Sequence, residues 1–154
     1  MISLEPVDGL DARLARLVQL YIHEWSALIP IAIGADATYR HEGLPLYRDR
    51  DDRAAFLLID AETQSPLGFA LILRDPSDCW HVEDFFVIAG ARRRGVGVAA
   101  ARALFAQRPG RWTFTVRPEN PAALAFWRRV VPAARETLEP GDDGVTRTRL
   151  SFEA

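Results

Sequence analysis

The chain has 154 residues, of which 49% are hydrophobic and 26% are charged, so it is long enough to bury a core and too apolar to be disordered. We expect one domain over residues 1–154. The formal net charge of −2 argues against a general nucleic-acid binder. No run of about 18 apolar residues suggests a membrane span, and the N-terminus lacks the basic and apolar regions of a signal peptide. We therefore expect a cytoplasmic protein with neither a membrane nor a nucleic-acid partner.

The candidate metal ligands are few and poorly spaced. The single cysteine, Cys79, cannot form an internal disulfide, and we expect it to be a small apolar packing residue. The pairs His23-Glu24 and His41-Glu42 are adjacent, whereas an i, i+4 spacing would place two ligands on one helical face. The sequence predicts no metal site.

The first third of the chain predicts a strand, a helix and an irregular stretch. The strand covers residues 2–7. Asp11 can cap a helix whose apolar side chains recur at three- and four-residue steps as far as Leu28, and Pro30 ends it. The irregular stretch, residues 30–52, carries four acids that either belong to an exposed loop or attract a cationic amine: Glu42, Asp49, Asp51 and Asp52.

The rest of the chain predicts a sheet interrupted by two helices. Strands are expected, in order, at residues 54–60, 67–74, 80–88, 111–117, 133–139 and 145–152. One helix begins at Gly95 and runs to Arg108. The other begins at Pro121 after Asn120, because asparagine accepts from the free N–H groups of a first turn and proline suits the first helical position.

Arginines and glycines stand where strand 80–88 gives way to a helix, in the order Arg92, Arg93, Arg94, Gly95, Val96 and Gly97. The first N–H groups of a helix carry partial positive charge, glycine lets a phosphate approach the backbone, and arginine adds full charges. The turn therefore favours an anion site, with a solvated arginine run as the alternative. The G-x-G-x-x-G and P-loop patterns are both absent.

This turn resembles the signature of the GNAT superfamily of acyl-CoA-dependent N-acyltransferases, Q/R-x-x-G-x-G/A after a central strand that ends in a hydrophobic residue. Arg92, Gly95 and Gly97 match the signature, and Val87 has the expected offset. A second family motif places an asparagine seven residues before an aromatic residue in the helix that follows the next strand. Asn120 and the aromatic residue at position 127 keep that spacing.

The resemblance implies an α+β fold, with a mixed, mostly antiparallel central sheet of six to seven strands flanked by about four helices. It implies acetyl-CoA as the acyl donor and a small-molecule or peptide amine as the acceptor. Members of the family often pair subunits, so the resemblance also allows a homodimer.

The resemblance further implies direct attack of the amine on the thioester in a ternary complex. A backbone N–H of the central strand would polarise the thioester oxygen, which points by position to Phe85, Phe86 and Val87. The diphosphate would lie on residues 92–97. Asn120 would contact the pantetheine or phosphate part of CoA in addition to capping its helix.

The base that accepts the amine proton is sought on the central strand. Strand alternation predicts that residues 81, 83, 85 and 87 lie on one face and that Asp84 lies on the other. His81 and Glu83 are therefore the candidates. Histidine has the more suitable pKa, whereas family members often use a glutamate, and we favour Glu83. The alternative is that both are satisfied polar residues at the edge of the sheet.

Trp127 departs from the family pattern, which commonly has a tyrosine there to protonate the departing thiolate. An indole N–H is a donor but not a usable acid at neutral pH. Trp127 can hold the sulfur by a hydrogen bond or, with Phe126, be a core aromatic residue. Three functional classes stay open: an acetyl-CoA-dependent N-acetyltransferase, a non-catalytic acyl-CoA-binding domain, which the missing tyrosine favours, and a phosphate-binding module without CoA.

Overall fold

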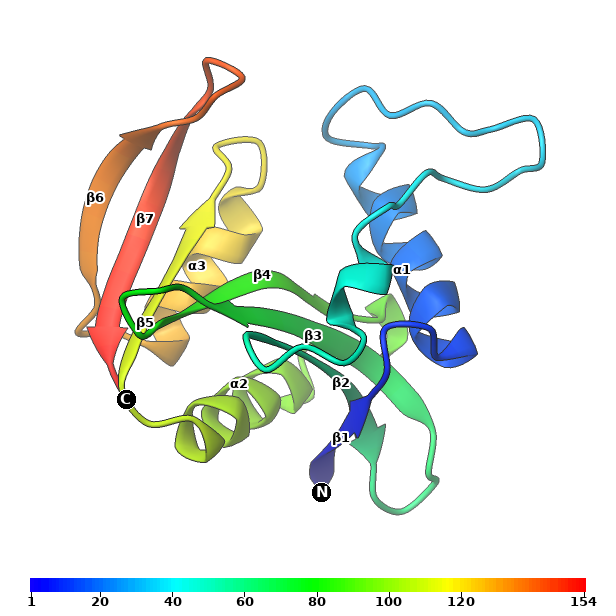
Figure 1. The fold of residues 1–154 in the computed structure, drawn as a ribbon, viewed down its shortest axis with the longest axis horizontal. Coiled ribbons are helices and arrows are strands. Elements are labelled where there is room, and N and C mark those ends of the chain that lie inside the picture. Colours follow the sequence, from blue (N-terminus) through cyan, green and yellow to red (C-terminus); the bar gives the residue numbers. More distant parts are fainter.

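The computed structural model describes residues 1–154 and contains one seven-stranded sheet, in the order β1-β2-β3-β4-β5-β7-β6 (Figure 1). Only the pair β4 and β5 is parallel. The predicted mixed, mostly antiparallel sheet is therefore confirmed. Its strands are β1 (Ile2–Val7), β2 (Arg53–Asp60), β3 (Pro66–Arg74), β4 (Cys79–Val87), β5 (Arg111–Val116), β6 (Arg135–Pro140) and β7 (Thr146–Glu153).

Three α-helices accompany the sheet, rather than the expected four: α1 (Ala12–Trp25), α2 (Val96–Gln107) and α3 (Pro121–Val130). Between α1 and β2 the chain forms only the 3-10 turn η1 (Leu44–Tyr47), and a second one, η2 (Ala89–Ala91), precedes α2. None of the helices combines the length and the hydropathy needed to cross a membrane.

The helix α1 ends at Trp25, whereas the apolar periodicity predicts that it continues to Leu28. Leu28 is 45% exposed. Pro30 restricts the backbone of the residue before it to extended conformations, so the chain leaves the helix through turns before the proline is reached. The predicted cap at the other end is confirmed, because the Asp11 carboxylate accepts from Arg13 N at 2.8 Å.

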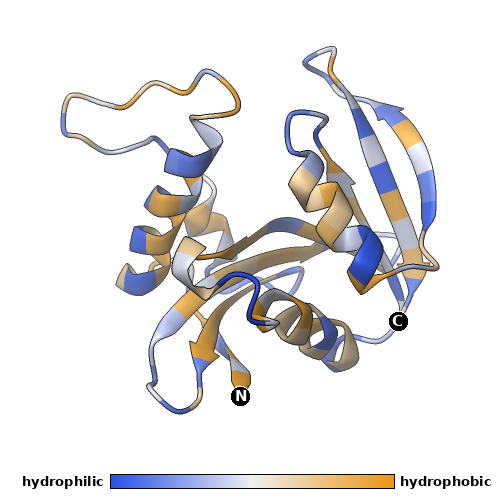
Figure 2. Cartoon of the chain, turned by 180° about the vertical axis from the view of Figure 1, so that it is seen from behind, coloured by the Kyte–Doolittle hydropathy of each residue, from blue (hydrophilic) through white to orange (hydrophobic).

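Each face of the sheet has its own core, and Figure 2 shows that the central strands between the helices are mostly hydrophobic. The helix α1 covers one face, and α2 and α3 cover the other (Figure 1). The core under α1 includes Leu14, Leu17, Val18, Leu57, Phe69, Leu71 and Phe86. The core under α2 and α3 includes Ile72, Val82, Leu104, Phe105, Trp112, Phe114 and Trp127.

Candidate active site

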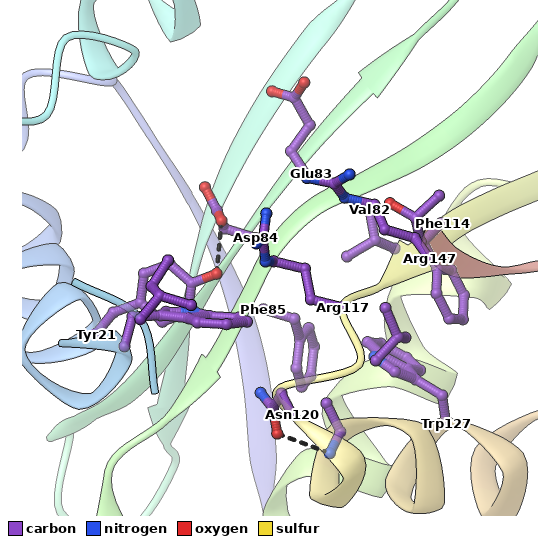
Figure 3. Close-up of a pocket in the computed structure, with 15 residues that line it drawn as sticks. Tyr21, Val82, Glu83, Asp84, Phe85, Phe114, Arg117, Asn120, Trp127 and Arg147 are labelled. Carbon is purple, nitrogen blue, oxygen red and sulfur yellow. Dashed lines mark hydrogen bonds between the residues drawn. The ribbon is translucent and has the colours of Figure 1, made fainter. Parts of the chain in front are cut away.

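A cleft opens where β4 and β5 diverge. Pairing between these parallel strands ends at His81 and Thr113, so beyond this point the edge of β4 that faces β5 has no strand partner. Residues from α1, β4, β5, α3 and β7 line the resulting cavity of about 350 Å³ (Figure 3). Its polar and aromatic lining includes Tyr21, Glu83, Asp84, Arg117, Asn120, Trp127 and Arg147.

A β-bulge in β4 sets which side chains face the cleft. Against β3, Ile72 pairs with Val82 and Leu71 pairs with Asp84, so Glu83 is an extra residue without a partner. The bulge reverses the alternation beyond it. The prediction that residues 81, 83, 85 and 87 share a face opposite Asp84 is therefore wrong. Asp84 lies on the α1 side, together with Glu83, whereas Phe85 packs on the α2 and α3 side.

Asp84 is the half-buried carboxylate of the cleft, and the hydroxyl of Tyr21 donates a hydrogen bond to it at 2.7 Å (Figure 3). Burial raises the pKa of Asp84, the Tyr21 hydrogen bond and the charge of a protonated His41 lower it, and Glu83 raises it. Burial and the Asp84 charge also raise the pKa of Tyr21, so Tyr21 remains a donor. A carboxylate with a raised pKa in a cleft is suited to accept a proton.

Glu83, the favoured base, lines the cleft but is tied to two neighbours. The hydroxyl of Tyr47 donates to its carboxylate, and Arg53 Nη1 donates to it at 3.0 Å. Burial and the hydrogen bond to Glu83 raise the pKa of Tyr47. These two donors already occupy oxygen lone pairs that would have to accept the substrate proton.

His81, the other candidate, does not line the cleft and contacts the turn between β3 and β4. Its Nε2 lies 2.8 Å from Asp75 Oδ2, and this hydrogen bond is the largest of several effects that hold the pKa of Asp75 well below its usual range. The thiol of Cys79 is partly buried, which raises its pKa. Potential ligand atoms of Asp75, Cys79 and His81 lie within 4.8 Å of one another, a cluster that sequence spacing did not reveal.

Arg92 is engaged within the protein. Its Nε donates to the Val87 carbonyl at 2.8 Å, and its Nη2 donates to both carboxylate oxygens of Glu24 at 2.7 and 2.6 Å. The guanidinium also lies 5.6 Å from the centre of the Phe86 ring. Arg92 thus joins the turn before α2 to the end of α1.

The turn itself presents backbone and positive charge to the outside. Gly95, with φ of 81°, is the N-cap residue of α2, and a Cβ placed on it would meet no atom within 4 Å. Beside it, a shallow groove is lined by Arg93, Arg102 and Arg129, none of which has a carboxylate within 4.0 Å. Arg94 is exposed and does not line the groove.

The two glycines of the motif differ in their surroundings. A Cβ on Gly97 would lie 3.1 Å from Phe126 Cε2 and 3.5 Å from Val87 Cγ2, so Gly97 allows α2 to pack closely against α3 and β4. Val96 is buried. Gly95 alone has the open surroundings that a bound anion requires.

Asn120 and Trp127 both line the cleft from α3 (Figure 3). Asn120 Oδ1 accepts from Ala123 N at 3.1 Å, which confirms the predicted cap. Trp127 is a core aromatic residue that is only 6% exposed, and its ring centre lies 5.2 Å from that of Phe85 and 4.4 Å from that of Phe114.

Sequence reasoning missed most of the cleft lining, including its charged residues Asp84, Arg117 and Arg147 and the tyrosine Tyr21. One feature of the sequence indicates that Asp84 can face the cleft. Two adjacent acids in an otherwise apolar strand cannot both follow a hydrophobic-in, polar-out alternation, and such a conflict favours a bulge. Tyr21 was predicted as part of the apolar stripe of α1, and no local pattern distinguishes it there.

Comparisons with known proteins agree with this geometry. A model of the acetyltransferase (GNAT) family matches residues 14–131. An acetyltransferase from Thermus thermophilus has a similar structure, with a TM-score of 0.76 and 23% identity over 100% of this chain and 97% of that chain. A GNAT family acetyltransferase from Staphylococcus aureus has a TM-score of 0.73 and 14% identity over 99% of each chain.

The ribosomal-protein-S18-alanine N-acetyltransferase from Escherichia coli also matches, with a TM-score of 0.68 and 17% identity over 99% of this chain and 94% of that chain. A search of curated protein sequences finds no match. The fold and the family match together define an acyltransferase. The chain belongs to the GNAT acetyltransferase family, as its two motifs suggest.

Proposed function

We propose that the protein is an N-acetyltransferase that moves an acetyl group from acetyl-CoA to a primary amine, by direct attack in a ternary complex. One observation carries the proposal: β4 leaves β5 after His81 and so exposes a strand edge beside Asp84, a carboxylate of raised pKa. An extended amide-containing donor can hydrogen-bond to a free strand edge, and an amine beside it needs a proton acceptor.

The diphosphate of the donor is assigned to the beginning of α2. The open backbone at Gly95 and the unpaired arginines Arg93, Arg102 and Arg129 fit an anion there. Arg92 contributes only after it releases Glu24, which now occupies its Nη2.

The pantetheine arm is assigned to the free edge of β4 along Phe85, Phe86 and Val87, with Asn120 on the opposite side of the cleft. A backbone N–H of this edge would polarise the thioester carbonyl and stabilise the oxyanion that forms during attack. The Val87 carbonyl already accepts from Arg92, so it is not available to the donor.

The proposed base is Asp84, in preference to Glu83 and His81. An alkylammonium ion with a pKa of roughly 10 must lose a proton before its nitrogen can attack the thioester carbon. Asp84 faces the cleft without a cationic partner, whereas Arg53 neutralises Glu83 and Asp75 binds His81. The first proton passes to Asp84 and the C–N bond forms. The C–S bond then breaks, and the nitrogen loses its second proton to the departing CoA thiolate or to solvent.

Trp127 lines the cleft near the expected position of the sulfur, and its indole nitrogen donates to no atom of the protein, whereas that of Trp112 donates to the Arg108 carbonyl at 2.8 Å. An N–H aimed at the sulfur would stabilise the developing thiolate by a hydrogen bond. No proton transfer from Trp127 is proposed.

The experiment is a thiol-release assay with acetyl-CoA and a panel of amines, together with calorimetry of CoA binding. We expect amine-dependent release, and we expect Asp84→Asn to lower kcat by about 10²-fold or more with little change in CoA affinity. Glu83→Gln is the matched control on the same strand and should retain most of the rate. Binding of acetyl-CoA without release for any amine would instead indicate the non-catalytic acyl-CoA-binding domain.

A further inference from the structure

The arginines of the cleft are already neutralised. Asp143 lies between Arg117 and Arg147, with N–O distances of 2.7 and 2.9 Å. Glu119 accepts two further hydrogen bonds from Arg117 at 3.2 Å. Two cations thus meet two carboxylates on this wall, and a substrate carboxylate would have to displace one of them.

One charged group of the cleft, Asp84, has no ion-pair partner within 4.0 Å. Glu83 is paired with Arg53 at 3.0 Å, whereas the only bonded partner of Asp84 is the neutral hydroxyl of Tyr21. With His41 neutral, the lining of the cleft together with its ion-pair partners therefore presents one uncompensated negative charge, and it lies where the attacking amine is expected. An arriving ammonium group would supply the missing counterion.

The long loop before β2 adds little free negative charge. Three of its five acids have an arginine partner nearby in the sequence, and Asp36 and Asp51 have none. The pairs are Arg40–Glu42, Arg48–Asp49 and Arg50–Asp52. A second or third ammonium group, as in a polyamine, would find no row of carboxylates along this loop.

The wall around Asp84 is apolar. Tyr21, Trp25 and Ile29 line it from α1 and the turn that follows, and the Tyr21 and Trp25 rings meet edge to face with centres 6.4 Å apart. Such a wall favours an aliphatic or aromatic substrate body over a polar one.

We propose that the acceptor is a primary monoamine with an apolar, preferably aromatic, body and no carboxylate beside the amine. This inference rests on the proposed function and narrows its acceptor class. It disfavours polyamines, because a second ammonium group lacks a counterion, and free amino acids, because Arg117 and Arg147 are occupied.

The test compares four amines in the thiol-release assay: 2-phenylethylamine, L-phenylalanine, L-phenylalaninamide and spermidine. The first three share an aromatic body and differ beside the amine. We expect kcat/KM for 2-phenylethylamine to exceed that for phenylalanine and for spermidine by about tenfold or more. Phenylalaninamide, which lacks the carboxylate, should recover most of the loss.

A variant can reduce this selectivity. Asp143→Asn removes the carboxylate that lies between Arg117 and Arg147, so the rate with phenylalanine should rise several-fold relative to 2-phenylethylamine. Asp142→Asn is the matched control, since Asp142 is an exposed neighbour in the same turn without an ion pair, and it should leave the ratio unchanged.

The apolar wall is tested in the same way. Trp25→Ala should raise KM for 2-phenylethylamine several-fold, whereas Leu28→Ala, beyond the helix and outside the cleft, should not. If the unmodified protein turns over spermidine or phenylalanine as fast as 2-phenylethylamine, or faster, the inference is overturned and the proposed function is upheld. Release with other amines of the wider panel but with none of these four overturns the inference alone, and absence of release with every amine, at saturating acetyl-CoA, overturns both.

Discussion

The hydroxyl of Tyr21 on α1 donates a hydrogen bond of 2.7 Å to Oδ1 of Asp84 in the bulge of β4. Burial raises the pKa of this carboxyl, and the Tyr21 hydrogen bond lowers it because a donor stabilises the ionised form. The helix α1 therefore takes part in setting the pH at which the proposed base becomes active.

Tyr21→Phe is expected to move the acid limb of the kcat/KM profile to higher pH. Loss of a donor to the carboxylate raises the pKa of Asp84, so a smaller fraction is ionised at a given acidic pH. Below the limb we expect kcat/KM to fall roughly tenfold, which corresponds to about 1.5 kcal/mol for a hydrogen bond to a charged group. Tyr39→Phe, which alters a tyrosine outside the cleft, is the control. An unmoved limb would argue that Asp84 is not the base.

Asp84→Asn should stabilise the fold at neutral pH although it removes the proposed base. In the unfolded protein the Asp84 carboxyl has a pKa of about 3.9, as is typical of aspartate. In the folded protein its pKa is higher. As the pH rises through this interval the unfolded state loses its proton first, so the free energy of unfolding falls, and the loss is complete above the folded pKa. Asparagine avoids this loss and can still accept from Tyr21.

Thermal unfolding from about pH 3.5 to 8 measures this effect. We expect the Tm of Asp84→Asn to exceed that of the unmodified protein by about 2–4 °C at pH 8, and the difference to vanish below about pH 4. Glu83→Gln should lower the Tm instead, because it removes the charged partner of Arg53. A lower Tm for Asp84→Asn at neutral or higher pH would contradict the prediction.

Local sequence patterns were sufficient to predict the strands, the caps at Asp11 and Asn120, and the glycine turn, because each depends on a few consecutive residues. They could not predict the bulge, which arises from how β3 and β4 pair and which reverses the faces of residues 84–87. Alternation alone therefore selected Glu83 over Asp84.

Contacts between residues that are distant in the sequence could not be predicted either. Arg92 was predicted to bind a phosphate, and the structure places it against Glu24, 68 residues away. Tyr21 meets Asp84 across 63 residues. Such pairs depend on the position of α1 over the sheet, which no motif in either segment encodes.

Glu24→Gln tests whether Arg92 also binds the diphosphate of the acyl donor. The pair is partly exposed, so its loss should lower the free energy of unfolding by less than about 1 kcal/mol. If the released guanidinium turns to the diphosphate, CoA should bind a few-fold more tightly, as measured by calorimetry. Glu5→Gln, which breaks a similarly exposed pair with Arg13, should leave the affinity unchanged. Weaker CoA binding by Glu24→Gln would show that the pair itself builds the site.

The groove beside α2 should contribute electrostatically to donor binding. Arg102→Ala and Arg129→Ala are each expected to raise the Kd of CoA by about two- to fivefold, because each removes an unpaired cation near the proposed diphosphate. The double variant should also show a weaker dependence of Kd on salt concentration. Arg94→Ala, an exposed arginine of the same turn outside the groove, is the control. Equal effects of all three single variants would indicate a diffuse field rather than a site.

Substitutions of the two glycines of the motif should have different effects on stability and on CoA affinity. Gly97→Ala places a methyl group 3.1 Å from Phe126 Cε2, so we expect the free energy of unfolding to fall by about 1–3 kcal/mol with CoA affinity nearly unchanged. Gly95→Ala meets no atom, but φ of 81° costs a side chain about 1–2 kcal/mol, and its methyl group would occupy the position assigned to the diphosphate. Its Kd for CoA should rise at least tenfold in calorimetry. Unchanged affinity in Gly95→Ala would remove the diphosphate from this turn.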